Sequence, residues 1–290
     1  MAGEAVVFRK KRPWRKALGA FAGAAAVFGA YGFWYEPSSL RAVEHRIALP
    51  QQNAIPDDPL RIAVISDLHG GAPYIGEAKI DAVVAFANDA KPDLILLTGD
   101  YVTKGVLGGW NMPIETIVTH LKALHAPLGV YAVLGNHDRW EDAARIAKAF
   151  EEAGIPVLDD RNTILKSDGQ PIHLAGISDY RTGPHDVDAA LAGVPKDAHA
   201  ICFTHSPDAF PVLPGTCALT IAGHTHGGQV WLPLLGRIIV PSHYGQRYAV
   251  GLIQEDGKYL FVSTGIGTSI LPVRFMVPPE VSILEIEAER

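Results

Sequence analysis

The sequence has few cysteines and lacks the motifs of several common protein classes. Its 290 residues include two cysteines, Cys202 and Cys217, with no CxxC spacing, so neither a zinc ribbon nor another thiolate metal site is supported. We treat both as small apolar residues in or near strands, and a disulfide between them as geometrically possible but not expected. No glycine-rich loop with a following lysine is present, which argues against nucleotide hydrolysis through a phosphate-binding loop.

Positive charge is scarce outside the amino terminus. Residues 1–16 carry six lysines and arginines and one acid, giving +5, while the whole chain is −6, which leaves −11 for the remainder. The chain after residue 16 therefore has no excess of basic residues to contact nucleic-acid phosphates, and we expect no nucleic-acid partner. The acidic balance fits either carboxylates that bind cations or an ordinary solvated surface.

One long uncharged run stands at the amino terminus. Ala17–Tyr35 has no formal charge over nineteen residues, and as a helix it would reach about 28 Å, close to the roughly 30 Å hydrocarbon thickness of a bilayer. It ends in Phe33-Trp34-Tyr35, an aromatic cluster typical of the lipid–water interface, and basic residues precede it. We therefore predict a single-pass anchor in the cytoplasmic membrane, with the following domain extracytoplasmic.

Two other interpretations of this run stay open. It is rich in alanine and glycine, so it also fits a cleaved signal peptide. An interfacial helix on the inner leaflet would instead leave the domain on the cytoplasmic face. On either interpretation we divide the chain into a basic terminus and apolar helix (1–36), a linker with a candidate edge strand at 43–49 (37–59) and one domain (60–290).

The spacing of apolar residues predicts strands and helices that alternate at first and then give way to strands. Helices are expected at 77–88, from Pro113 onward, at 140–153 and at 187–191. Strands are expected at 61–66, 94–98, 130–134, 172–177, 200–204, 219–222, 252–254, 259–263 and 281–285. This order predicts a layered α/β fold of two packed sheets with helices outside.

Five of the predicted strands are each followed by side chains that commonly bind metals. Taken singly they are weak signals, because Asp-x-His arises by chance, Gly-Asp is often a turn or cap, Asn-His-Asp fits a turn before a helix, and a lone histidine is usually structural. Their coincidence at strand ends, where loops of α/β sheets build sites, predicts one shared site. The residues are Asp67, His69, Asp100, Asn136, His137, Asp138, His205, His224 and His226.

These residue types suit a pair of divalent cations. Two such ions about 3.5–4 Å apart need a shared anionic ligand, and a strand-end aspartate can supply it. Nitrogen and oxygen donors without sulfur favour Mn, Fe or Zn. Such a pair acidifies a bound water and clamps the oxygens of a phosphoryl group, which makes phosphoester hydrolysis the expected chemistry.

The motifs also resemble those of a known family. Asp67-x-His69, Gly99-Asp100, Gly135-Asn136-His137-Asp138, His205 and Gly223-His224-Thr225-His226 are similar to the motif set of the calcineurin-like metallophosphoesterases, from about Ile62 to the carboxyl terminus. The resemblance implies a four-layer α/β/β/α sandwich and attack by a metal-bound hydroxide. It also implies one metal on Asp67, His69 and His226, a second on Asn136, His205 and His224, and a bridging Asp100.

The resemblance further implies that His137 protonates the leaving oxygen and that Asp138 orients it. Their adjacency in sequence agrees with this, because a neighbouring carboxylate would raise the pKa of the imidazole toward the range of a general acid.

Motifs beyond the metal ligands resemble the membrane-associated branch of the family. The sequences Gly-His-Thr-His-Gly-Gly-Gln (223–229), Pro-Ser-x-Tyr-Gly (241–245), Gly-Ile-Gly-Thr-Ser (265–269) and Leu-Pro-Val-Arg-Phe (271–275) are similar to this branch. Its members resemble UDP-2,3-diacylglucosamine pyrophosphohydrolases of lipid A synthesis or are phosphodiesterases of undefined substrate. The branch is broad, so the resemblance leaves the substrate open.

Two apolar segments, 230–239 and 270–277, fit either a lipid-binding groove or ordinary core packing. Arg274 is a candidate phosphate clamp or a surface cap, and Trp231 and His243 are further candidates for substrate contact.

We therefore expect a dinuclear metal-dependent phosphoesterase that cleaves a phosphodiester or pyrophosphate, with a lipid-linked substrate such as UDP-2,3-diacylglucosamine as the specific hypothesis. An extracytoplasmic phosphomonoesterase and a non-catalytic binding module on the same fold are the alternatives. The sequence does not indicate an oligomeric state.

Overall fold

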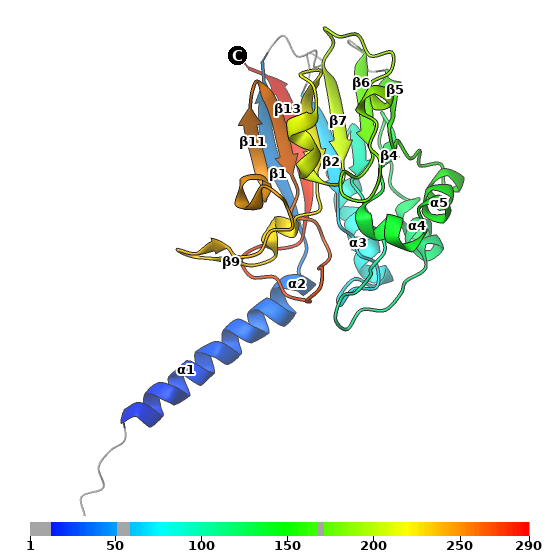
Figure 1. Ribbon diagram of the computed structural model, residues 1–290. Coiled ribbons are helices and arrows are strands. Elements are labelled where there is room, and N and C mark those ends of the chain that lie inside the picture. Colours follow the sequence, from blue (N-terminus) through cyan, green and yellow to red (C-terminus); the bar gives the residue numbers. More distant parts are fainter. Residues whose placement is uncertain (1–12, 51–58, 167–170, 290) are drawn as a thin grey trace, which may run out of the picture.

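The computed structural model describes residues 13–50, 59–166 and 171–289. Within these residues the strands form two larger mixed sheets and a small hairpin, and helices lie on the outer faces of the sheets (Figure 1). This is the two-sheet α/β fold that the sequence predicts. Most of the basic segment and residues 51–58 of the predicted linker lie outside the described residues.

The first sheet orders its strands β1-β13-β2-β3-β4. β13 is parallel to β1 and antiparallel to β2, and the pairs β2–β3 and β3–β4 are parallel. The bounds are β1 Arg41–Leu49, β2 Leu60–Ile65, β3 Leu94–Leu97, β4 Val130–Ala132 and β13 Glu280–Ala288.

The second sheet orders its strands β11-β12-β8-β7-β6-β5. The inner pairs are parallel, and β11 and β5 close the two edges as antiparallel strands. The bounds are β5 Arg161–Leu165, β6 Ile172–Ile177, β7 Ala200–Thr204, β8 Cys217–Ala222, β11 Gly251–Glu255 and β12 Lys258–Val262. β5 is the strand of this sheet that the sequence pattern did not predict, since its burial alternates weakly.

Side chains along the central strands alternate between two buried layers, one between the sheets and one under the helices. In β2, Ile62 and Val64 belong to the core between the two sheets, whereas Ala63 and Ile65 face the helices. Phe203 of β7 and Ile221 of β8 complete the inter-sheet core from the other side. Successive side chains of a strand point to opposite faces, so an unbroken apolar run serves two buried layers at once.

The helices follow the predicted positions closely. Their bounds are α3 Glu77–Asp89, α4 Ile114–Leu121, α5 Asn136–Glu152 and α6 Val187–Ala190, with short 3-10 turns η2 Pro207–Val212, η3 His226–Gly228 and η4 Gly245–Tyr248. Helices α3, α4 and α5 pack on the first sheet, and α6 packs on the second. α5 begins four residues before the predicted start at Trp140, because Asp138 in its first turn accepts a hydrogen bond from the Gly135 N–H and caps the helix.

Strand β1 lies within the predicted linker. The edge strand expected at 43–49 is present, but it pairs with β13 over nine residues and buries Ile47 and Leu49 in the inter-sheet core. Residues 41–49 are therefore part of the sheet, and we propose that the globular unit starts at Arg41 and not at residue 60.

The apolar amino-terminal run is a helix that projects away from the domain (Figure 1). It comprises α1 Pro13–Ala30, a π-helical turn η1 Tyr31–Tyr35 and α2 Glu36–Ser38. Among the described residues, the stretch Trp14–Ser38 is the one helix long and apolar enough to cross a membrane, with a mean hydropathy of 1.4 over its best window. Length and composition alone fit an anchor or a signal sequence equally.

Cys202 and Cys217 form a disulfide, which corrects the expectation that both are free. β7 and β8 are parallel neighbours, and an irregular register near Ala200 leaves the two cysteine Cα atoms 5.4 Å apart. This separation lies within the usual disulfide range. Which strands are neighbours is a property of the topology, so residue spacing did not reveal the pair.

Candidate metal centre

The strand-end residues that the sequence singled out meet at one end of the two sheets. β2 leads to Asp67 and His69, β3 to Asp100, and the residues after β4 to Asn136. The second sheet supplies the other ligand candidates from the ends of β7 and β8. The seven predicted metal-ligand side chains are all buried: Asp67, His69, Asp100, Asn136, His205, His224 and His226.

Asp100 lies at the middle of this cluster. Its Oδ2 atom is 3.3 Å from Nε2 of His205, 3.6 Å from Nε2 of His69 and 4.0 Å from Nε2 of His137. Its other oxygen accepts a hydrogen bond of 2.8 Å from the His137 backbone N–H, which fixes the carboxylate plane. One oxygen therefore faces imidazoles from both halves of the cluster, as a bridging ligand would.

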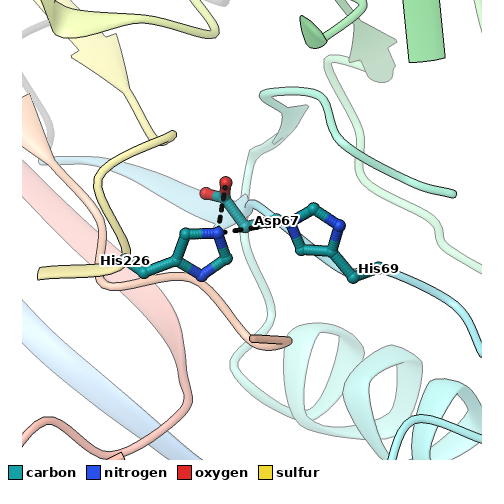
Figure 2. Close-up of side chains that lie close together, drawn as sticks. All are labelled: Asp67, His69 and His226. Carbon is teal, nitrogen blue, oxygen red and sulfur yellow. Dashed lines mark hydrogen bonds and ion pairs between the residues drawn. The ribbon is translucent and has the colours of Figure 1, made fainter. Parts of the chain in front are cut away.

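Asp67, His69 and His226 form the first half of the cluster, and Figure 2 shows their side chains pointing toward one another. Nε2 of His226 lies 3.2 Å from Nε2 of His69 and 3.4 Å from Oδ1 of Asp67. Nδ1 of His69 is 3.3 Å from the Val102 carbonyl and donates to it, which leaves the Nε2 lone pair for the site.

Asn136, His205 and His224 form the second half. Nε2 of His205 is 3.1 Å from Oδ1 of Asn136 and 3.1 Å from Nδ1 of His224. Nδ1 of His205 donates to the Thr98 carbonyl at 2.8 Å, which orients the ring so that its Nε2 faces the cluster. Asp100, His205 and His224 can together hold an ion.

The donor atoms fit a pair of divalent cations. In each half of the cluster two imidazole nitrogens converge to 3.1–3.2 Å, so the nitrogen donors of each half gather at one point. Nε2 of His224 is buried with no hydrogen-bond partner among the described residues. Nitrogen and oxygen donors in two adjoining groups around one carboxylate are a donor set that suits a dinuclear metal site.

Burial keeps most of these imidazoles in the neutral form that binds metals. Desolvation lowers the pKa of His69 and of His226 to about 3, and it takes the pKa of His224 well below its ordinary value. Burial opposes the charged form of His205 as well, but the adjacent Asp100 carboxylate raises its pKa to about 10. Together these shifts describe a desolvated site with one strong anion at its centre.

The backbone of the site is held in an uncommon conformation. Asp67, His69, Asp100, His224 and His226 all have positive φ, between 47° and 70°. Side chains other than glycine rarely adopt this left-handed region, at a cost of order 1 kcal/mol each. Five such residues within one cluster show that the loops are bent to aim these side chains inward.

Gly223 allows the β8 loop to approach the β2 loop closely. A Cβ atom at this position would lie 1.7 Å from Oγ of Ser66 and 2.5 Å from Oδ2 of Asp67. The backbone N–H of the next residue, His224, donates to the Asp67 carboxylate at 2.9 Å. This hydrogen bond fixes the position of the Asp67 carboxylate relative to His224. It is possible because Gly223 has no side chain.

We therefore expect Gly223→Ala to damage the site. The added methyl must displace Ser66 or Asp67, which costs about 1–3 kcal/mol of stability by overpacking and separates the first ligand group. Gly215→Ala, at a position where a Cβ meets nothing within 4 Å, is the matched control. Thermal unfolding and metal content of the two variants, measured side by side, test this, and equal metal content in both would contradict it.

The structure corrects the role expected for Asp138. Its carboxylate does not contact the His137 ring but accepts hydrogen bonds from the backbone N–H groups of Asp100, Tyr101, Val102 and Gly135 at 2.7–3.2 Å. It therefore fixes the loop that carries Asp100. The expected rise in the pKa of His137 is also wrong, because burial lowers that pKa.

His137 itself reaches the cluster. Its Nε2 is 4.0 Å from Oδ2 of Asp100, and its ring packs against His69 and Trp140. Its Nδ1 atom is buried with no hydrogen-bond partner among the described residues. The ring is therefore held by packing, with nitrogen atoms free to meet a ligand.

The three residues predicted to contact substrate have different surroundings. Arg274 is fully buried, and its guanidinium donates to the carbonyls of Thr264, Gly267 and Val277. It cannot also clamp a phosphate, and it lies 3.5 Å from Nδ1 of His226 instead. His243 is exposed on the loop held by Asp208, and half-buried Trp231 pairs through its backbone N–H with Phe275.

Sequence reasoning missed the residues that support the ligands. The Thr98 carbonyl orients His205, Asp138 holds the Asp100 loop, and Arg274 packs behind His226. The contact of His205 with the Thr98 carbonyl could not be predicted, because every residue has a backbone carbonyl and the sequence does not show which one a side chain will meet. The charge of Arg274 within an apolar segment was a signal, but it was interpreted as ligand binding.

Two packed mixed sheets with buried aspartate and histidine ligands at their strand ends define a metallohydrolase with a dinuclear site. The family model described as calcineurin-like phosphoesterase matches residues 60–228. The chain belongs to this family, and it is a metal-dependent phosphoesterase.

Curated relatives agree with this assignment along nearly the whole chain. The chain is 30% identical over 279 residues to the uncharacterized metallophosphoesterase YkuE of Bacillus subtilis, covering 92% of this chain and 93% of the relative. It is also 30% identical over 279 residues to phosphodiesterase YaeI of Escherichia coli, covering 94% and 98%. An uncharacterized metallophosphoesterase of Aquifex aeolicus is 28% identical over 239 residues, covering 79% and 86%.

Proposed function

We propose that the protein hydrolyses a phosphodiester or pyrophosphate bond at the cluster centred on Asp100. The observation that carries this proposal is the position of Asp100 Oδ2, which faces imidazoles of both ligand groups at 3.3–4.0 Å. In this proposal Asp67, His69 and His226 hold one metal, Asn136, His205 and His224 hold the other, and Asp100 is shared. When bound, two divalent cations supply an acidified water and positive charge for the phosphoryl oxygens. The donor set suits Mn, Fe or Zn.

The protein's own groups prepare this chemistry. The Val102 and Thr98 carbonyls fix the ring orientation of His69 and His205, so their Nε2 atoms are set before any ligand arrives. Burial excludes bulk water and strengthens each electrostatic interaction within the cluster. Asp138 holds the Asp100 loop through backbone hydrogen bonds and keeps the shared carboxylate in place.

His137 is the proposed proton donor to the leaving oxygen. Burial is the largest cause that lowers its pKa, so the surroundings of the free site favour the neutral ring. An anionic phosphoester beside the ring favours the imidazolium form and raises the pKa, which brings the proton to the place where the leaving oxygen develops charge.

A diester substrate is supported by a relative, and a lipid-linked one by the surroundings of the site. YaeI, which is similar over nearly the whole chain, is named a phosphodiesterase. The apolar amino-terminal helix projects from the domain. We therefore propose a lipid-linked phosphodiester or pyrophosphate as substrate, with UDP-2,3-diacylglucosamine as a specific compound to assay.

We further propose that the helix is an uncleaved membrane anchor and that the domain is extracytoplasmic. The basic residues precede the helix, as the positive-inside rule requires. The buried Cys202–Cys217 disulfide supports an oxidising compartment. The Arg274 backbone N–H donates to the Gly32 carbonyl of this helix, and Phe275 packs against Tyr31, so cleavage after these two helix residues would remove contacts of the folded domain.

Full-length protein in detergent micelles, reconstituted with Mn, Fe or Zn, tests the reaction. We expect bis-p-nitrophenyl phosphate to be hydrolysed with a kcat/KM at least about tenfold above that for p-nitrophenyl phosphate, which is a transition-state preference of about 1.4 kcal/mol. A chelator should abolish both activities and added metal should restore them. A preference for the monoester would support a phosphomonoesterase, and activity insensitive to chelation would contradict the metal mechanism.

A further inference from the structure

Exposed apolar side chains gather at the end of the domain where the amino-terminal helix joins it. Leu234 and Leu235 form the tip of the hairpin between β9 Trp231–Leu232 and β10 Gly236–Arg237, which projects beside α2 in Figure 1. Ile238 and Ile239 follow the hairpin, with 64% and 74% of their surface exposed, and Ile270 on the adjoining loop is 72% exposed. Apolar side chains gathered in this way mark an interaction surface.

A cavity of about 320 Å³ lies among these segments. Its lining is overwhelmingly apolar and includes Val230, Ile238, Ile239, Ile270, Leu271 and Val273. The same cavity is also lined by Thr225 and His226 of the metal loop. We call this cavity the apolar groove, and it connects a ligand of the metal centre with the exposed apolar side chains.

The wall of the apolar groove is fixed to the amino-terminal helix. The ring of Phe275 packs edge-on against Phe28 and Tyr31, with centroids 5.9 Å and 5.5 Å apart. The backbone N–H of Arg274 donates to the Gly32 carbonyl at 2.9 Å. Loop 269–277 is therefore docked on the helix, and a helix embedded in a bilayer holds this loop at the lipid surface.

We propose that the apolar groove binds a hydrocarbon chain of the substrate, which enters from the bilayer while its phosphoester reaches the metal centre. This proposal rests on the phosphoesterase function proposed above. A hydrocarbon chain fits the groove because the lining gives it few polar groups and because the helix brings the opening to the lipid. The contact of the groove with His226 places the polar end of such a chain at the reacting site.

A chain-length series tests the proposal with one leaving group throughout. The substrates are ethyl and octyl p-nitrophenyl phosphate, and the readout is the ratio of their kcat/KM values for full-length protein in lipid nanodiscs. We expect wild-type protein to prefer the octyl ester by at least about tenfold, well within what six additional buried methylenes can supply. Ile239→Asp should bring this ratio close to one.

The matched control is Ile164→Asp, on edge strand β5, where the isoleucine is 54% exposed and lies outside the groove. Both substitutions replace an exposed side chain, so neither threatens the core. The control should keep the wild-type ratio, and any partition of the octyl ester into lipid affects all variants alike. A wild-type ratio near one, or an equal loss in the control, would overturn the proposal.

Binding of octyl and ethyl phosphonate by calorimetry gives the same comparison without turnover. If the ethyl ester is cleaved but chain length has no effect on cleavage or binding, the groove proposal fails and the phosphoesterase function stands. If neither ester is cleaved but octyl phosphonate binds more tightly than ethyl phosphonate, and Ile239→Asp removes the difference, the groove proposal stands and the proposed reaction fails.

Discussion

Asp100→Ala should lose both the activity and the metal pair. Its Oδ2 atom faces His205, His69 and His137 at 3.3–4.0 Å, and without this anion two divalent cations about 3.5–4 Å apart have no shared ligand to offset their repulsion. We expect kcat/KM for bis-p-nitrophenyl phosphate to fall by about 10³ or more, equivalent to roughly 4 kcal/mol of transition-state stabilisation. Metal analysis should find fewer than two ions per chain.

A second variant separates the site from folding. Asp100→Asn keeps the volume and an oxygen that can accept the hydrogen bond from the His137 backbone, yet it removes the charge. It should unfold near the wild-type temperature and still lose the second ion. Asp197→Ala, in an exposed loop, is the control for removing an aspartate. An Asp100→Asn protein with wild-type turnover and two ions would rule out the bridging role.

His137→Gln should lower turnover while leaving both metals bound. Its ring faces the cluster 4.0 Å from Asp100 Oδ2 without belonging to either proposed ligand group, so its loss removes a proton donor and no ligand. General acid catalysis contributes typically 10²–10⁴-fold, and we expect kcat to fall within this range for a substrate with an alkoxide leaving group. The fall should be smaller with p-nitrophenolate, which leaves without protonation.

The control for this variant is His125→Gln, where the histidine is exposed in the connection between α4 and β4. It should match wild type with every substrate. Comparing kcat for an alkyl and a p-nitrophenyl diester separates proton donation from a structural role. An equal loss with both leaving groups would show that His137 acts in another way, and loss of metal would show that it is a ligand.

The positions of the site residues could be predicted because strands and their ends have sequence signatures. Each apolar run such as 94–97 predicts a buried strand, and parallel strands deliver their following residues to one edge of a sheet. Asp100 and His205, more than 100 residues apart in sequence, were therefore expected to meet. In the structure Oδ2 of Asp100 lies 3.3 Å from Nε2 of His205.

The directions of individual side chains were not predictable. Asp138 follows His137 in sequence, but helix α5 turns its carboxylate toward the backbone of the Asp100 loop. Arg274 has the residue type of a phosphate clamp, yet its guanidinium is buried against carbonyls. Both errors came from assigning a role by chemical type, when the fold decides which neighbours each group meets.

Contacts between segments that are distant in sequence could not be predicted either. The disulfide depends on the adjacency of β7 and β8, and the membership of β1 in the first sheet depends on its pairing with β13. The contact of Glu36 with the backbone at Met276 joins the two ends of the chain. None of these follows from local spacing, because each is set by the packing of segments that are distant in sequence.

Anomalous diffraction from crystals of the full-length protein grown with manganese tests whether the cluster holds two ions that share Asp100. We expect two anomalous peaks about 3.5–4 Å apart, with Asp100 contacting both. One should lie beside Asp67, His69 and His226, and the other beside Asn136, His205 and His224. The absence of anomalous density within this cluster, or a single ion that Asp100 does not contact, would show that these residues do not form a dinuclear centre bridged by Asp100.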